Sequence, residues 1–209
     1  MVSRDAPAPP HDLHCPLPSL PLVFGTRLES IPAQVPYVRA DAARVALWQA
    51  RLSGAGCKVG LVWSSQSKHR TAPAKSIPLD ALAPLAGVPG VRFYSLQKGE
   101  AAREAQRPPA GLPLEDLGGE LRDFADTAAV MANLDLVISV DTAAAHLAGA
   151  MARPAWTLLK HAPDWRWLLA REDCPWYPGM RLFRQKAPGA WDAVIEEAAR
   201  ALRQLAAHG

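Results

Sequence analysis

The feature that most constrains the fold is a repeated alternation of short apolar runs with helical patterns. The clearest run is Leu136–Val140 (LVISV), which is β-branched, has the length of one strand and is followed by small residues at helical spacing. Near-continuous apolar strands separated by helices are typical of a parallel sheet that is buried on both faces. The sequence therefore predicts an α/β fold with helices on both faces of a parallel sheet.

Regular structure is expected to start near Asp41, which is a good N-cap for a helix that ends at the SGAG turn. Further helices are expected at 78–85, 99–106, from Asp126 or Thr127 as a cap to Leu134, from Asp141 as a cap to Met151, and at 191–205. Strands are expected at 58–63, 91–96, 112–114, 136–140, 154–159 and 180–183.

The first 36 residues differ in composition from the rest of the chain. They hold eight of the 20 prolines, and the stretch HCPLPSLPLVFG cannot form a continuous helix or a central strand. The leucines of this stretch are too apolar for a free tail. We therefore expect an extended strap over residues 1–36, followed by one domain over residues 37–209.

Composition excludes several classes of protein. The net charge is only +3, and no basic run or aromatic stripe indicates a nucleic-acid binder. Cys15, Cys57 and Cys174 have neither disulfide nor zinc spacing. The start of the chain lacks the apolar region of a signal peptide, and no apolar run reaches the ~18 residues of a membrane span. We expect a cytoplasmic protein without a membrane span.

The loop that follows the LVISV strand carries the most informative polar residues. In parallel sheets, ligands bind beyond the carboxyl ends of the strands. Here Asp141 and Thr142 precede a helix that opens with Ala143 and Ala144, whose small side chains leave the helix N-terminus open to a phosphate. His146, one turn further on, could donate a ring N–H to the same anion. An equally good interpretation makes Asp141 a plain helix cap and His146 a satisfied helix residue.

Two other strand ends carry candidate ligands. After Trp63 come hydroxyl, amide and cationic side chains that suit a diphosphate, namely Ser64, Ser65, Gln66, Lys68, His69, Arg70 and Lys75. A solvated basic loop is an equal alternative. After the next strand come Gln97, Lys98 and Glu100, at the place where an acidic or amide side chain commonly binds a ribose hydroxyl. An exposed turn is the simpler interpretation there.

Sharper catalytic motifs are absent from the sequence. It contains no GxGxxG, no GxxxxGK[ST] and no GxSxG, which argues against an ordinary NAD site, a P-loop and an α/β-hydrolase. It also contains no DxD pair and no HExxH, so neither a bound metal nor another cofactor is expected.

The chain resembles glycosyltransferase family 9, the bacterial heptosyltransferase-like proteins. The resemblance rests on VISVDTAAAHLAGAMARPAWTLL, on KVGLVWSSQSKHR with KSIPL, on FYSLQKG, and on PDWRWLL with PWYPGMRLFRQ. The longer string FADTAAVMANLDLVISVDTAAAHLAG is similar to the region found behind tetratricopeptide repeats in many bacterial proteins. With HCPLPSLPLVFGT, the resemblance covers nearly the whole chain from His11.

This resemblance implies one Rossmann-like half of a GT-B fold, the half that binds a nucleoside-diphosphate sugar for transfer with inversion and without a metal. The family's Asp-Thr-Gly matches Asp141 and Thr142, but its glycine is Ala143 here, which narrows the backbone approach. His146 matches the family histidine. Phosphate contacts would come from Ser64, Ser65 and Lys68, ribose contacts from Gln97 or Glu100, and base contacts from the loop with Asp123 and Phe124.

The resemblance also implies that an acceptor domain and the catalytic base lie outside this chain. The strap then is the remnant of that missing N-terminal domain, and an acceptor domain or tetratricopeptide repeats are the expected partners besides the nucleotide-sugar. Two alternatives stay open. The chain could be a non-catalytic nucleotide-binding module, or a protein-interaction module that uses its tryptophans, Trp156, Trp165, Trp167 and Trp176.

Overall fold

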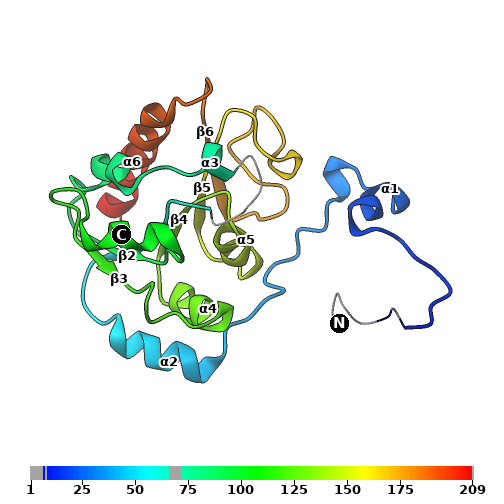
Figure 1. Ribbon diagram of the computed structural model, residues 1–209, viewed down its shortest axis with the longest axis horizontal. Coiled ribbons are helices and arrows are strands. Elements are labelled where there is room, and N and C mark those ends of the chain that lie inside the picture. The colour runs from blue at the N-terminus through cyan, green and yellow to red at the C-terminus, as the bar shows by residue number, and fades with distance from the viewer. Residues whose placement is uncertain (1–6, 8, 66–71, 209) are drawn as a thin grey trace. The chain divides into compact units, whose positions relative to one another are not determined.

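A computed structural model gives the structure, which describes residue 7, residues 9–65 and residues 72–208. Six strands form one sheet in the order β3-β2-β1-β4-β5-β6, and every pairing is parallel (Figure 1). The strands are β1 Cys57–Val62, β2 Val91–Ser95, β3 Leu114–Asp116, β4 Leu136–Val140, β5 Ala155–Leu159 and β6 Met180–Arg184. The predicted α/β parallel sheet is confirmed. Because the strand order reverses between β1 and β4, their carboxyl ends mark the place where such sheets bind ligands.

The helices of the domain connect or cover these strands. They are α2 Ala42–Arg51, α3 Ala72–Lys75, α4 Phe124–Ala132, α5 Ala143–Ala150 and α6 Trp191–His208, with 3-10 turns η3 Leu79–Leu85, η4 Glu100–Gln106 and η5 Trp165–Trp167. The segments expected as helices at 78–85 and 99–106 are therefore 3-10 turns. Pro84 lies inside η3, and its missing N–H prevents an α-helical hydrogen bond there.

Two expected helix caps were wrong by one or a few residues. Asp123, not Asp126 or Thr127, caps α4, because its carboxylate accepts a hydrogen bond from the Asp126 N–H at 2.8 Å. The N-cap of α5 is Thr142, whose backbone is extended and whose side chain makes no capping hydrogen bond. Asp141 therefore lies before the helix and is free for other contacts. The weak strand expected at 112–114 lies at Leu114–Asp116 instead, since Pro113 has no N–H to donate to a sheet.

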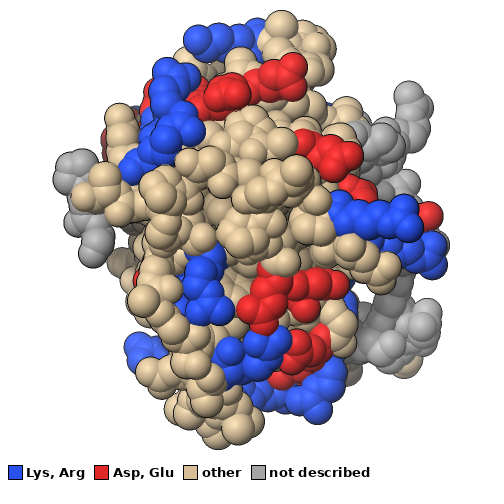
Figure 2. Space-filling model, turned by 90° about the vertical axis from the view of Figure 1, so that its left-hand side faces the viewer, with Lys and Arg blue, Asp and Glu red and all other residues tan. Residues whose placement is uncertain are grey.

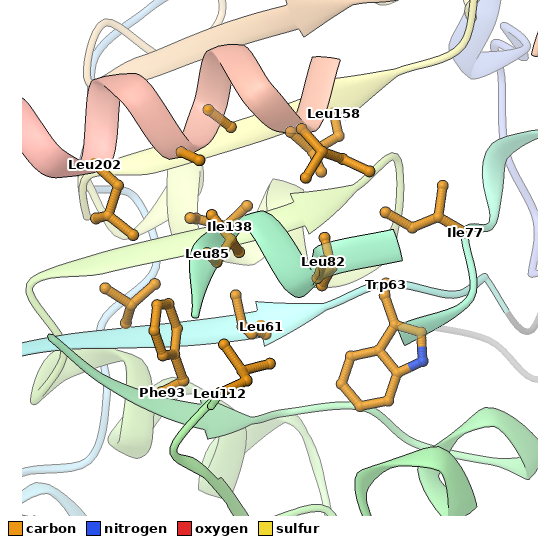
Figure 3. Packing of buried hydrophobic residues seen from close by; sticks show 14 of the residues in the cluster. Leu61, Trp63, Ile77, Leu82, Leu85, Phe93, Leu112, Ile138, Leu158 and Leu202 are labelled. Carbon is orange, nitrogen blue, oxygen red and sulfur yellow. The ribbon is translucent and has the colours of Figure 1, made fainter. Parts of the chain in front are cut away.

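The sheet separates two apolar clusters. Along β4, Ile138 packs into the cluster with η3 and α6, and its neighbour Val137 packs into the cluster with α4 and α5. Figure 3 shows residues of the first cluster, in which Leu85 of η3 and Leu202 of α6 belong to the same apolar group as Ile138 of β4. Side chains alternate between the faces of a strand, so a strand covered on both sides must be apolar throughout, as β4 is.

The chain divides into two units, Met1–Pro32 and Ala33–Gly209. In the first unit, Leu17–Ser19 is a 3-10 turn and Leu20–Val23 is one helical turn (α1), followed by the 3-10 turn Leu28–Ser30. The expected extended conformation was wrong over these residues. Pro18 and Pro21 each stand at the first or second residue of a helical turn, where no backbone N–H is required.

The second unit begins with a segment that is tied to α5. The N–H groups of Tyr37 and Val38 both donate to the carbonyl of Ala150, at 3.0 and 3.2 Å. Val35 and Val38 pack against the cluster that contains α4 and α5. These bonds use a carbonyl at the end of α5 that has no partner within the helix.

Gly149 in α5 provides room for an aromatic ring. A Cβ at this position would lie 2.4 Å from Cγ of Tyr177. We expect Gly149→Ala to lower the free energy of unfolding by about 1–3 kcal/mol, because the ring must move to relieve the overlap. Urea unfolding would measure the loss. Gly87→Ala is the matched control, since a Cβ there meets no atom within 4 Å, and equal stabilities of the two variants would contradict the prediction.

Candidate functional site

A cavity of about 500 Å³ lies beyond the carboxyl ends of β1 and β4. It therefore stands at the strand reversal that the sheet topology singles out. Its lining combines polar and cationic side chains with the apolar Val62 and Leu96. The lining residues are Val62, Ser64, Ser65, Lys75, Leu96, Gln97, Lys98, Phe124, Thr127, Asp141, Thr142, Ala143, Ala144, His146 and Arg166.

The N-terminus of α5 forms one wall of this cavity. Ala143 and Ala144 line it, and as first-turn residues their N–H groups have no carbonyl acceptor within the helix. The Thr142 hydroxyl lies 2.9 Å from Oγ of Ser139, which itself donates to the Val140 carbonyl at 2.7 Å. Thr142 is thus the donor to Ser139, and its own oxygen is left to accept. This wall has the partial positive charge that favours an anion.

Asp141 is part of an ion pair inside the cavity. Its Oδ2 accepts a hydrogen bond from Nζ of Lys75 at 3.2 Å, and its Oδ1 lies 3.9 Å from Nε2 of His146. Asp141 is 8% exposed, so it needs a nearby cation. The sequence marks Lys75 only as one of several cations in the loop after β1. The structure gives it a place at the end of α3 that faces Asp141.

His146 is held on three sides. Its Nδ1 lies 3.2 Å from Oη of Tyr177, its ring stacks on Trp167 with 4.9 Å between centroids, and it meets the edge of the Tyr177 ring. Burial lowers the pKa of His146 below its usual value, and the nearby Asp141 carboxylate opposes this only in part. The imidazole is therefore neutral at pH 7 and carries one donor and one acceptor nitrogen.

Gln97 connects the ends of β1 and β2. Its Oε1 accepts hydrogen bonds from the N–H groups of Trp63 at 3.0 Å and Ser64 at 2.8 Å. Its Nε2 donates to the carbonyls of Ser64 and Lys98 at 3.0 and 2.9 Å. This amide makes four hydrogen bonds to backbone and is buried, so in this arrangement it lines the cavity and has no free donor for a ribose.

The other residues expected at the ribose and base lie in different settings. Lys98 lines the cavity, and its Nζ donates to the carbonyls of Gly118 and Leu121 at 2.7 and 2.6 Å. Glu100 is exposed at the start of η4 and is not among the cavity residues. Asp123 caps α4 and pairs with Arg44 at 2.9 Å, and the Asp126 N–H lowers its pKa most, with Arg44 adding to this. Phe124 lines the cavity and is 62% exposed.

The structure places most of the expected phosphate ligands together. Ser64, Ser65, Asp141, Thr142, Ala143, Ala144 and His146 all line the cavity. The N–H of Ser65 donates to Oγ of Ser76 at 3.0 Å, which fixes the start of the loop after β1. Gln66 and Lys68, also expected at the phosphate, lie outside the described residues, as do His69 and Arg70.

Two polar residues of the cavity, Thr127 and Arg166, were not foreseen from the sequence, nor were the apolar Val62 and Leu96. Arg166 belongs to the tryptophan-rich turn after β5, where the side chain of Asp164 caps η5 and lies 3.3 Å from Nε of Arg166. Leu168, two residues on, has a positive φ of 53°, which a non-glycine residue adopts only under local constraint. The rule that ligands bind beyond strand ends would have found this cation, since its turn directly follows β5.

The four tryptophans raised in the sequence analysis lie in different surroundings. Trp167 is fully buried, Trp156 and Trp176 are partly buried against the two apolar clusters, and Trp165 is 57% exposed. On the face shown in Figure 2, acidic and basic side chains are interspersed and form no continuous area of one sign.

Within residues 7, 9–65 and 72–208, no group of three or more His, Cys, Asp or Glu side chains could hold a metal ion. No helix of that same part is long and apolar enough to cross a membrane.

Comparison with known proteins relates the chain to one family. Residues 80–172 match the family described as glycosyltransferase family 9 (heptosyltransferase). This match includes β2, β4, β5, α5 and the turn with Arg166. Protein FlbA of Caulobacter vibrioides is 35% identical over 190 residues, which cover 86% of this chain and 31% of that protein.

Solved structures share the fold. The ADP-heptose LPS heptosyltransferase II of E. coli superposes with a TM-score of 0.58 at 16% identity, over 83% of this chain and 55% of that one. A family 9 glycosyltransferase of Veillonella parvula gives 0.60 at 13% identity, over 87% and 56%. E. coli heptosyltransferase WaaC with ADP gives 0.51 at 21%, over 86% and 53%. This chain thus spans about half of these enzymes and has the fold of one half of their GT-B architecture.

Proposed function

We propose that this chain, whose residues 80–172 match glycosyltransferase family 9 (heptosyltransferase), is the donor-binding half of a GT-B glycosyltransferase. Its cavity would hold the diphosphate of a nucleoside-diphosphate sugar. The single observation that carries the proposal is the meeting of the α5 N-terminus, Lys75 and Arg166 in one cavity at the ends of β1 and β4. An open helix N-terminus and two cations together suit a dianion better than any neutral ligand.

The same groups would serve the reaction by stabilising the leaving group. When the glycosidic bond to the donor breaks, negative charge develops on the departing diphosphate. The N–H groups of Ala143 and Ala144 and the cation of Lys75 are already in place to meet that charge, which is the electrostatic form of catalysis. The base that activates an acceptor would come from another domain, and inversion at the sugar would follow from attack on the face opposite the diphosphate.

Nucleotide titration by calorimetry tests the proposal. E. coli WaaC has been solved with ADP, so ADP is the first ligand to titrate, followed by UDP and GDP. We expect at least one diphosphate to bind the full chain, and ADP to bind more tightly than AMP, because the β-phosphate adds charge at the helix N-terminus. Absence of binding by all three diphosphates at millimolar concentration would refute the proposal.

We expect His146→Ala to weaken the binding of that diphosphate by about 1–2 kcal/mol, the scale of a hydrogen bond to a charged group. Calorimetry gives the affinity and thermal unfolding gives the stability. The control is His161→Ala, since His161 is on the turn after β5 but not among the cavity residues. If His146→Ala lost stability but kept its affinity, His146 would be a packing residue.

A second candidate is a module that binds a nucleotide without catalysis. The observation in its favour is that Lys75 is already paired with Asp141, while the polar groups of Gln97 and Lys98 are bound to backbone. Fewer polar groups are then available to bind a nucleotide than the sequence predicts. Transfer of sugar by the chain together with an acceptor domain would exclude this candidate, and nucleotide binding without transfer would support it.

A further inference from the structure

We infer that Tyr177 is a positioning residue for His146: its hydroxyl donates a hydrogen bond to Nδ1 and so keeps the ring proton on Nε2, and Tyr37 completes the chain by donating to Tyr177. The inference rests on the proposed function, because it states how His146 is prepared to donate to a diphosphate. It adds two residues, from outside the cavity lining, to the machinery of the site.

One ring nitrogen and two hydroxyl oxygens form the chain of contacts. Oη of Tyr177 lies 3.2 Å from Nδ1 of His146 and 3.4 Å from Oη of Tyr37. The Tyr177 ring lies against Gly149, one turn after His146 on α5, where no side chain could fit beside it. Helix geometry and ring packing thus bring the Tyr177 hydroxyl to one nitrogen of the imidazole, Nδ1.

The direction of the hydrogen bonds follows from what faces the other nitrogen. Nε2 of His146 points toward the Asp141 carboxylate, 3.9 Å away, and His146 lines the cavity. Carboxylate and phosphate oxygens only accept hydrogen bonds, so a proton on Nε2 is favoured by both. A neutral imidazole then has a bare Nδ1 that must accept, and the hydroxyl of Tyr177 is the donor it meets.

The hydroxyl of Tyr177 remains a donor because it does not ionise. Its burial raises its pKa above the ordinary value for a tyrosine. The charged groups that act on His146 are Asp141 and Asp164, which favour its cation, and Arg166 and Lys75, which oppose it. Since these oppose one another and burial favours the neutral form, the ring is neutral and its tautomer decides what it can donate.

Tyr37 joins this chain from the segment that precedes α2. Its N–H and that of Val38 donate to the carbonyl of Ala150 at the end of α5. Tyr37 is 64% exposed, and its hydroxyl meets that of Tyr177 at a partly buried position. Tyr37 therefore makes two contacts with this part of the site. Its backbone bonds to the end of α5, and its hydroxyl meets that of Tyr177.

The test is nitrogen NMR of the histidine rings in the full, ¹⁵N-labelled chain near pH 7.5, together with ADP titration. Long-range ¹⁵N–¹H correlation distinguishes a protonated from a bare ring nitrogen, and His146→Gln identifies the His146 signals by their loss. The variants are Tyr177→Phe, which keeps the ring against Gly149 and removes only the hydroxyl, and Tyr37→Phe, which removes the outer hydroxyl of the chain.

We expect the unmodified chain to show the Nε2–H tautomer of His146, and Tyr177→Phe to show a mixture of both tautomers. ADP affinity should fall by about threefold to tenfold in Tyr177→Phe and by less than about twofold in Tyr37→Phe, the scale of one hydrogen bond. A bare Nε2 in the unmodified chain, or an unchanged tautomer in Tyr177→Phe, would overturn the inference. The tautomer of the unmodified chain can be measured even if the variants do not fold.

The tautomer is measured in the absence of nucleotide. The proposed function and the positioning of His146 by Tyr177 can therefore be refuted independently. A chain with the expected tautomer shift but no nucleotide binding would refute the proposed function and retain the positioning by Tyr177. A chain that binds ADP while Tyr177→Phe changes neither tautomer nor affinity would retain the function and refute the positioning.

Discussion

Lys75→Met is expected to weaken ADP binding by about 1.5–3 kcal/mol, which is roughly tenfold to a hundredfold in the dissociation constant. The variant removes a cation from the cavity and leaves the Asp141 carboxylate without its partner, 8% exposed and facing the same space. A diphosphate then meets one positive charge fewer and one unbalanced negative charge. Calorimetry at two salt concentrations measures the effect, which should shrink at high salt.

Two further variants separate charge from folding in this experiment. Lys58→Met is the matched control, because Lys58 stands at the opposite end of β1 from the cavity, and its affinity should equal that of the unmodified chain. The double variant Lys75→Met with Asp141→Asn removes both charges, so it should recover stability lost in the single variant but not its full affinity. Equal affinity of Lys75→Met and the unmodified chain would mean that Lys75 only balances Asp141.

Trp167→Ala is expected to lower the free energy of unfolding by about 3–5 kcal/mol, the largest effect predicted for this chain. Trp167 is fully buried in the cluster between the sheet and α5, and its ring stacks on His146. Its carbonyl also accepts a hydrogen bond from Nη2 of Arg184 at 3.0 Å. Truncation leaves a cavity directly beneath the imidazole, so ADP affinity should fall as well.

Urea unfolding checks this prediction against a neighbouring tryptophan. Trp165 belongs to the same 3-10 turn but is 57% exposed, and Trp165→Ala should cost less than about 1 kcal/mol. The pair differs in burial and shares residue type and turn. A loss under 1 kcal/mol in Trp167→Ala would contradict the packing assigned to it.

The sheet could be predicted from the sequence because its signal is local. Each strand is a short apolar run, and a strand such as β4 that packs on both faces has to be apolar at every position. Polar residues that directly follow a strand were also foreseeable as neighbours, since parallel strands bring their ends to one edge. Ser64, Asp141 and Thr142 meet in this way.

Roles within the site were harder to predict, because they depend on contacts across the chain. Aspartate is a residue type that commonly caps helices, but the partner of Asp141 is Lys75, 66 residues earlier in the chain. Gln97 follows a strand as a nucleotide ligand would, yet four backbone groups of three other residues take up its amide. The contacts of Asp141 and of Gln97 cannot be inferred from spacing in the sequence, because they depend on which strands are neighbours in the sheet.

Helix limits were missed for a different physical reason. Asp123 and Asp126 are both good caps. Arg44 pairs with both of them, and only Asp126 also pairs with Arg122, at 3.1 Å, inside the first turn of α4. Pro84 in η3 shows the converse case, where a residue that opposes an α-helix is accommodated by the narrower 3-10 turn.

The bonds between the segment before α2 and the end of α5 limit where the gene can be shortened. A chain that starts at Ala33 retains Val35, Tyr37 and Val38, and with them both hydrogen bonds to the carbonyl of Ala150. A chain that starts at Asp41 retains every strand and every helix from α2 onward, yet it leaves that carbonyl without these donors and uncovers part of the apolar cluster beneath. For expression and crystallisation, the boundary of this domain is therefore set by a stretch without regular secondary structure.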